Sequence, residues 1–65
     1  MTEKQKLFCE EYLIDLNATQ AALRAGYSEK TAYSIGNENL KKPEIQEYIQ
    51  KRLKEKEDAL IAKVE

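Results

Sequence analysis

The stretch Asn17–Leu40, NATQAALRAGYSEKTAYSIGNENL, contains two short helix patterns separated by a very tight break. Asn17 can cap the first helix, with Gln20 reaching back to it as in a capping box, and Gly26 ends that helix. Ser28 can cap the second helix. A connection this short that contains glycine is typical of a helix-turn-helix, in which two helices cross at a steep angle. The stretch therefore predicts a helix-turn-helix; an ordinary helical hairpin stays open, because the same geometry also serves packing alone.

Small residues are concentrated where the two helices would have to approach each other. Ala18, Ala21, Ala22 and Ala25 fall at helical spacing in the first helix. Their side chains let a second helix pack closely without leaving voids. Gly36 lies inside the second helix, where glycine costs about 1 kcal/mol relative to alanine. Such a glycine serves close packing or contact with a ligand, and we expect packing.

A further helix is predicted before this stretch, over about Glu3–Leu16. Thr2 followed by Gln5 forms a capping box at its start. Leu7 and Ile14 point almost opposite to the apolar stripe of this helix, and we expect them to meet another helix rather than to stay exposed. The stripe itself consists of Phe8, Cys9, Tyr12, Leu13 and Leu16.

Two more helices complete the predicted fold. The second helix of the helix-turn-helix covers about Glu29–Leu40, and a fourth covers about Pro43–Val64, because proline fits the first position of a helix. The sequence thus predicts an all-α fold, a compact helix-turn-helix domain of four helices, the last one long and extending toward an oligomerisation region. The residues expected to be largely buried are Phe8, Tyr12, Leu13, Ala22, Tyr27, Ile35, Ile45 and Ile49.

The end of the chain differs from the rest in its pattern. We expect residues 1–54 to form the helix-turn-helix domain and residues 55–65 to form a helical tail. Leu53, Leu60 and Val64, with Ile61, keep a seven-then-four spacing like that of a coiled-coil seam. A solvated tail and the start of an oligomerisation region both fit this pattern. Since one heptad cannot hold helices together, the 65-residue chain is expected to be mainly monomeric in dilute solution.

Composition excludes several kinds of site. The chain has one cysteine and no histidine, so it offers neither an intrachain disulfide nor a cysteine-histidine metal site, and we expect no cofactor. Cys9 lacks the usual activating partner of a nucleophilic thiol and is expected in the core. Paired carboxylates such as Glu10 and Glu11 lie on predicted helix surfaces, so no catalytic residues are predicted and the protein is expected not to be an enzyme. No signal-peptide pattern or long apolar run is present, which predicts an intracellular protein without a membrane partner.

Charge is distributed unevenly along the chain. The formal net charge is −1, from 11 basic and 12 acidic residues, which does not suit a generic, charge-driven nucleic-acid binder. Residues 37–54 nevertheless hold five basic residues against three acidic ones, whereas residues 2–16 and residues 55–65 are each net negative. The positive bias therefore lies around and just after the second half of the helix-turn-helix.

If the helix-turn-helix binds DNA, its second helix should present the side opposite to its core positions Ala32, Ile35 and Leu40. An asparagine there can pair with adenine, and a lysine can contact guanine or a phosphate. Tyr33 lies at the border of the two faces, where it could stack along a phosphate-sugar edge of the DNA or cover the core, and of these we expect the core. The residues predicted to bind DNA are Lys30, Thr31, Ser34 and Asn37 toward the groove, with Lys41 and Lys42 toward phosphates.

About two thirds of the chain resembles a known family. The residues that carry the likeness are Lys4-Gln5, Phe8, Tyr12-Leu13, Asn17-Ala18-Thr19, Ala21-Ala22, Ala25-Gly26-Tyr27-Ser28, Ile35-Gly36, Leu40, Lys42-Pro43 and Ile45. In this order they resemble the N-terminal DNA-binding domain of the small terminase subunit of tailed double-stranded DNA bacteriophages, also found in prophages.

The resemblance implies a function. Small terminase subunits are not enzymes: they recognise the packaging site on viral DNA, assemble into rings, and recruit and regulate the large terminase subunit, the ATPase and nuclease. Packaging takes place in the cytoplasm of the bacterial host. This chain would supply the DNA-binding module, and the regions that contact the large subunit would lie outside it. A helix-turn-helix transcriptional regulator and a protein-interaction module without DNA binding are the alternatives.

Overall fold

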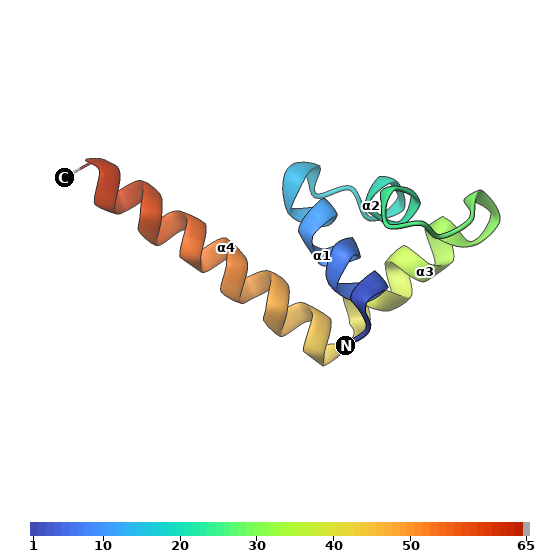
Figure 1. Cartoon of the computed structure of the whole chain (residues 1–65). Coiled ribbons are helices and arrows are strands. Elements are labelled where there is room, and N and C mark those ends of the chain that lie inside the picture. Colours follow the sequence, from blue (N-terminus) through green and yellow to red (C-terminus); the bar gives the residue numbers. More distant parts are fainter. Residues whose placement is uncertain (65) are drawn as a thin grey trace.

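The computed structural model describes the backbone of residues 1–64 and the side chains of residues 1–55. Four helices follow one another: α1 (Glu3–Asp15), α2 (Ala18–Arg24), α3 (Glu29–Lys41) and α4 (Pro43–Val64). Helices α1 to α3 gather into one body, and α4 leads away from it (Figure 1). The predicted all-α, four-helix architecture is confirmed, with the ends of α1 and α3 shifted by one residue from their expected positions.

The start of α1 has both halves of its predicted capping box. The backbone N–H of Gln5 donates to the Thr2 hydroxyl at 3.1 Å, and the backbone N–H of Thr2 donates to the Gln5 side chain at 2.9 Å. Two of the groups that a helix start leaves unpaired are satisfied in this way. The capping box therefore stabilises the first turn of α1.

The predicted box at α2 is only half formed. The Gln20 backbone N–H donates to the Asn17 side chain at 3.1 Å, as expected of a cap. However, the Asn17 backbone N–H donates to the carboxylate of Asp15, also at 3.1 Å, and so has no need of the Gln20 side chain. At α3, Ser28 holds the cap position without a side-chain cap bond.

The turn between α2 and α3 is built on Gly26, whose φ of 102° lies in the left-handed region. The N–H of Gly26 donates to the Leu23 carbonyl at 3.1 Å, and the N–H of Tyr27 donates to the Ala22 carbonyl at 3.0 Å. This pair of bonds is a Schellman motif, which glycine adopts without the steric cost that a Cβ would add. The motif ends α2 and turns the chain sharply into α3, as a helix-turn-helix requires.

Helices α2 and α3 cross where the side chains are smallest. Gly36 in α3 faces Ala18 in α2, and a Cβ at position 36 would lie 2.9 Å from the Ala18 carbonyl oxygen. Real Cβ atoms do not come that close to a backbone oxygen. The packing role predicted for Gly36 is therefore confirmed.

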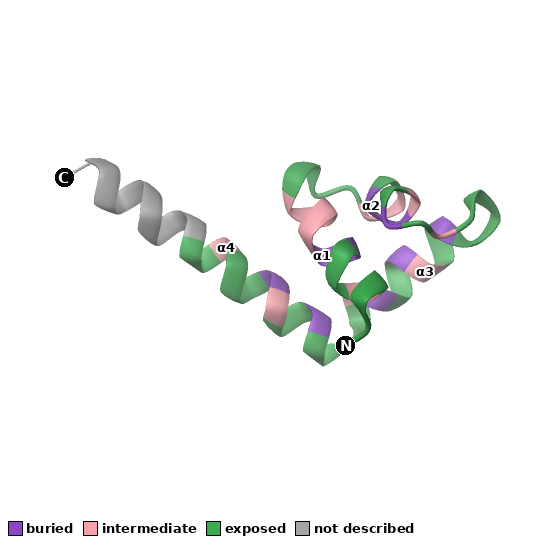
Figure 2. Ribbon diagram, viewed as in Figure 1, coloured by how far each residue is buried: buried purple, intermediate pink, exposed green. Residues whose placement is uncertain are grey.

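The core lies between α1, α2, α3 and the first part of α4, on their inner sides (Figure 2). Phe8 and Ile45 are fully buried, and the Phe8 ring stacks on Tyr12 with 6.0 Å between centroids. Cys9 is buried beside them, as predicted; its burial, together with the charge of Glu10, raises the pKa of the thiol to about 11. The buried hydrophobic residues are Phe8, Cys9, Ala21, Ala22, Ala25, Ala32, Ile45 and Ile49.

Several other predicted core residues lie at the edge of this cluster. Tyr12, Leu13 and Tyr27 are partly buried and pack against it. Ile35 is also partly buried. A polar residue that the apolar pattern did not indicate, Asn39, is only 2% exposed, and its Nδ2 has no hydrogen-bond partner among the described residues.

The expectation for the outer face of α1 was wrong. Leu7 is 44% exposed and Ile14 is 70% exposed, so both side chains stay exposed. The physical reason is the docking of α4, whose Ile45 and Ile49 enter the core beside the inner face of α1. No described helix is left to cover the opposite face. Leu60, Ile61 and Val64, which form the predicted seam, lie outside the residues whose side chains the structure describes.

Candidate nucleic-acid interface

Helix α3 has one buried and one exposed side. Ala32, Gly36 and Asn39 are buried. Their spacing of four and three residues places them on one face, because an α-helix repeats every 3.6 residues. The face directly opposite is open to solvent, and all six residues predicted to bind DNA are exposed.

Four of the six predicted residues form a stripe along the exposed side of α3. Lys30, Ser34, Asn37 and Lys41 are spaced by four, three and four residues, the same repeat as the buried side. The stripe is about 16 Å long at 1.5 Å per residue, with a lysine at each end and neutral polar groups between them. Its length exceeds the width of about 12 Å of the major groove of B-DNA, so the end at Lys41 can face a phosphate backbone while the rest of the stripe lies over the groove. We call these four residues the α3 stripe.

The other two predicted residues lie beside the α3 stripe. Thr31 is on the flank of the helix, and its hydroxyl lies 2.9 Å from the Ser28 hydroxyl, within hydrogen-bond distance. The contact joins the Thr31 side chain to Ser28, the N-cap residue of α3. Lys42 is the C-cap of α3, with an extended backbone, and its side chain is exposed next to the end of the stripe at Lys41. The structure thus brings two lysines together at the corner between α3 and α4.

Tyr33 is the residue that sequence reasoning misplaced. The sequence predicts that it covers the core, but it is 69% exposed. It lies three residues after Lys30 and four before Asn37, so it borders the α3 stripe. The same spacing could have indicated this position from the sequence. The small residues of α3 that face α2, above all Gly36, leave no room for a tyrosine ring at the crossing.

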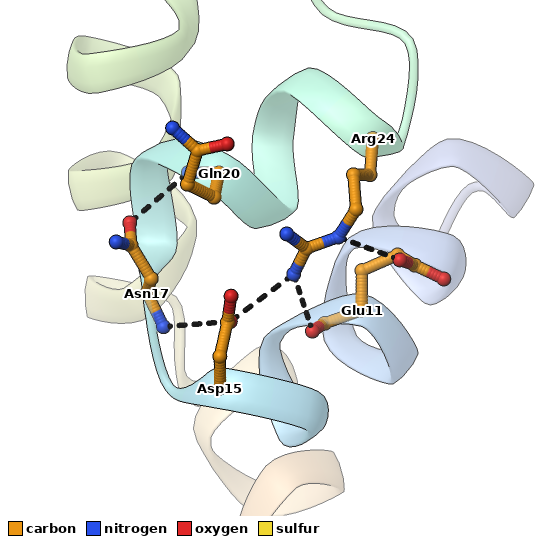
Figure 3. A network of polar contacts seen from close by, with 5 residues as sticks. All are labelled: Glu11, Asp15, Asn17, Gln20 and Arg24. Atoms are coloured by element: carbon orange, nitrogen blue, oxygen red, sulfur yellow. Dashed lines mark hydrogen bonds and ion pairs between the residues drawn. The ribbon is translucent and has the colours of Figure 1, made fainter.

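Arg24, a cation at the end of α2, is engaged within the fold (Figure 3). Its Nε donates to the Glu11 carboxylate at 2.7 Å, and its Nη2 donates to the Glu11 carbonyl at 3.0 Å and to Asp15 at 3.1 Å. The hydrogen bond from Arg24, followed by that from the Asn17 N–H, lowers the pKa of Asp15. This network ties the end of α2 to the end of α1.

Arg52 is engaged in the same manner between α1 and α4. Its guanidinium contacts Glu10 at 3.1 Å and Glu55 at 3.4 Å. The Tyr48 hydroxyl donates to the second oxygen of Glu10 at 3.0 Å. Partial burial and this bond raise the pKa of Tyr48. The Glu10 carboxylate therefore holds two residues of α4 at once.

The lysine side chains differ from the two arginines in their ion pairing. In residues 1–55, ion pairs involve Arg24, Arg52 and the N-terminal amine, and none involves a lysine side chain. Lys4 lies 5.0 Å above the centroid of the Tyr27 ring, a cation–π contact that leaves its charge on the surface. Lysine is a compact charge that contacts phosphates without fixed geometry. The lysines of the α3 stripe and corner are therefore available to phosphates.

Other kinds of site find little support in the described part of the chain. There, no group of three acidic or cysteine side chains comes together in a way that could hold a metal ion. Among the described helices, none combines the length and apolar character needed to cross a bilayer.

Together these features define an all-helical helix-turn-helix domain whose second helix presents a polar and cationic face. The model of a family described as "Terminase small subunit" matches residues 1–65. The chain belongs to this family.

Relatives from phages and a bacterial genome support the assignment. The chain is 55% identical over 56 residues to the terminase small subunit of Bacillus phage SF6, covering 85% of this chain and 39% of that protein. It is 42% identical over 65 residues to the one of Bacillus phage SPP1, covering 98% and 44%. It is 40% identical over 55 residues to the PBSX phage terminase small subunit of Bacillus subtilis (strain 168), covering 85% and 21%. The chain thus spans less than half the length of these relatives.

Proposed function

We propose that this chain is the double-stranded DNA-binding module of a phage or prophage terminase small subunit, and that it binds through the exposed face of α3. The observation that carries the proposal is the α3 stripe in a member of this family. The stripe lies opposite the buried side of the helix, and the lysines at its ends form no ion pair among residues 1–55. Lys30, Ser34 and Asn37 face the groove, and Lys41 and Lys42 face phosphates. Thr31 contributes from the flank.

Within the longer protein, we expect this module to recognise the packaging site on viral DNA. Residues 1–54 form the binding domain, and residues 55–65 lead toward an oligomerisation region. The full-length oligomer recruits and regulates the large terminase subunit, in the cytoplasm of the bacterial host. The partial coverage of the relatives leaves room for these further regions.

Weak binding by one copy is compatible with this role. The net charge of −1 predicts low affinity for a single module, on the order of the 10⁻⁴ to 10⁻⁶ M of non-specific contacts. Several copies held in one oligomer gain about 10² to 10⁴ in total affinity through effective concentration. The packaging site would then be recognised by the assembly rather than by one domain.

A catalytic role is not part of the proposal. Glu10 and Glu11, the paired carboxylates of α1, both accept hydrogen bonds from arginines and therefore serve the packing of helices. The Cys9 thiol is buried, and its raised pKa keeps it protonated at neutral pH.

The test compares two double variants that remove the same charge. Lys41→Ala with Lys42→Ala should weaken binding to every duplex and reduce the salt slope by about 0.9 for each phosphate that the variant no longer neutralises. Lys51→Ala with Lys54→Ala removes two exposed lysines from α4 and should change binding much less. Fluorescence anisotropy at two or more salt concentrations measures both. Equal effects of the two pairs would show that only net charge matters and would place the surface elsewhere.

The alternatives are separated by the choice of DNA. A gel-shift series with packaging-site DNA, scrambled DNA and a promoter fragment distinguishes a packaging protein from a transcriptional regulator. Preference for the promoter would favour the regulator, which needs a dimer to space two half-sites. Absence of any shift, with the protein in an assembled form, would favour a protein-interaction module.

A further inference from the structure

The kinds of cation on the exposed face of α3 limit which bases this face can recognise. The chain has two arginines, Arg24 and Arg52, and both guanidinium groups are held by carboxylates. Arg24 belongs to α2 and Arg52 to α4, so α3 itself presents no guanidinium fork, the commonest reader of guanine O6 and N7. Lys30 offers a single mobile charge, which serves a guanine or a phosphate equally well. Discrimination between bases must come mainly from the uncharged side chains of α3.

Asn37 is the first such side chain. It is exposed at the middle of the α3 stripe. The α3 residues whose hydrogen bonds involve a side chain, among residues 1–55, are Thr31, with Ser28, and Leu40, whose carbonyl accepts from Gln46, so the Asn37 amide is free to pair outward. A free carboxamide matches adenine, because it can accept from N6 and donate to N7 in the major groove.

Tyr33 is the second. It is the only tyrosine of the four in the chain that is exposed, since Tyr12, Tyr27 and Tyr48 all pack against the core. A helical side chain leans toward the N-terminus, so we expect the ring to lie over the turn that contains Lys30. That end of a recognition helix is the part that approaches base edges. The ring offers an apolar surface of the kind that contacts the C5-methyl group of thymine.

We infer that α3 selects a site containing A·T base pairs, with Asn37 on an adenine and Tyr33 on the methyl group of a nearby thymine. The two residues lie four apart on one face, about 6 Å along the axis, so they address the same or neighbouring base pairs. This inference rests on the proposed DNA binding and adds the class of sequence recognised.

The experiment starts from a pool of randomised duplexes, from which the 65-residue chain selects sequences at low salt, where phosphate contacts are strongest. The enriched site should contain a thymine and an adenine as its most restricted positions. Deoxyuridine in place of that thymine should weaken binding by the parent about four-fold, the factor for one buried methyl group. 7-Deazaadenine in place of that adenine, which removes N7, should weaken it by about five-fold or more.

Variants assign each effect to a residue. Tyr33→Ala should bind thymine and deoxyuridine sites equally, whereas Tyr33→Phe should keep the preference for thymine because it keeps the ring. Asn37→Ala should lose the response to 7-deazaadenine alone. Ile14→Ala, which removes an equally exposed apolar side chain from α1, should leave all preferences unchanged.

Two results overturn the inference. Enrichment of G·C pairs at the restricted positions contradicts it, as does a parent protein that binds thymine and deoxyuridine sites with equal affinity. If the Lys41 and Lys42 double variant still weakens binding in that case, DNA binding through α3 stands and only the assignment of bases fails. If neither the 65-residue chain nor the longer protein in its assembled form selects or binds any duplex, the proposed function fails together with the inference.

Discussion

Gly36 of α3 lies so close to Ala18 of α2 that a single added carbon would come within 2.9 Å of the Ala18 carbonyl oxygen. This close approach fixes how near the two helices of the helix-turn-helix come to each other.

The close contact between α2 and α3 predicts that Gly36→Ala lowers the stability of the fold, the opposite of the usual effect of this change in a helix. In an unhindered helix this change stabilises by about 1 kcal/mol. Here the methyl group has to push α2 away, and overpacking of this kind costs about 1 to 3 kcal/mol. Chemical denaturation followed by circular dichroism should show a loss of stability. A variant as stable as the parent would mean that the crossing is looser than the structure shows.

Two adjacent residues of α1, one buried and one exposed, test which face of this helix belongs to the core. Phe8 is fully buried, and Phe8→Ala should cost about 3 to 5 kcal/mol, which is most of the stability of so small a domain. Leu7, the preceding residue, is 44% exposed, so Leu7→Ala should cost far less. Thermal melts of the two variants give the comparison. Similar losses would show that Leu7 is covered in solution.

The Arg24 network predicts a dependence on pH. Because Arg24 and the Asn17 N–H lower the pKa of Asp15 in the folded state, the stabilisation is complete above the unfolded pKa of about 3.9 and is lost as the pH falls through the lower folded value. In Arg24→Gln, the pKa of Asp15 should move up toward its ordinary range. An NMR titration of the Asp15 carboxyl measures this shift directly, and an unchanged titration would mean that the ion pair does not form in solution.

The oligomeric state of the 65-residue chain is a further prediction. We expect a monomer in dilute solution, because the tail offers one heptad only. Light scattering over a range of concentrations decides it. Replacing Leu60 and Val64 with lysine is the matched variant. A stable oligomer that survives both replacements would contradict the monomer and the suggested role of the tail as well.

Most of the fold could be predicted because its boundaries carry local signals. Thr2 and Gln5 start α1, Gly26 ends α2, and Pro43 opens α4, each for a reason that involves only neighbouring atoms. The close approach at Gly36 also followed from residue size. Such signals place helices along the chain but do not say which faces meet.

What the sequence could not show depends on tertiary contacts. The periodicity of α1 has two apolar sides, and only the docking of α4 decides that Leu7 and Ile14 stay exposed. Tyr33 was misplaced for a related reason, since hydrophobicity does not reveal that the crossing has no room for a ring. The ion pairs of Arg24 join residues nine and thirteen positions apart, which no local pattern indicates. The candidate DNA surface was thus predicted by residue type, whereas the absence of the arginines from it was not.

Helix α4 begins inside the domain, where Tyr48 and Arg52 clamp it to Glu10, and continues unbroken to Val64. Its 22 residues span about 33 Å. The orientation of the α3 face relative to any segment that continues α4 is therefore set by the number of helical residues between them. Inserting one residue after Glu55 would rotate the continuing segment by about 100° relative to the α3 face, whereas inserting seven residues would nearly restore the original orientation. In the proposed assembly, the direction in which each domain presents α3 would thereby depend on the number of residues in α4.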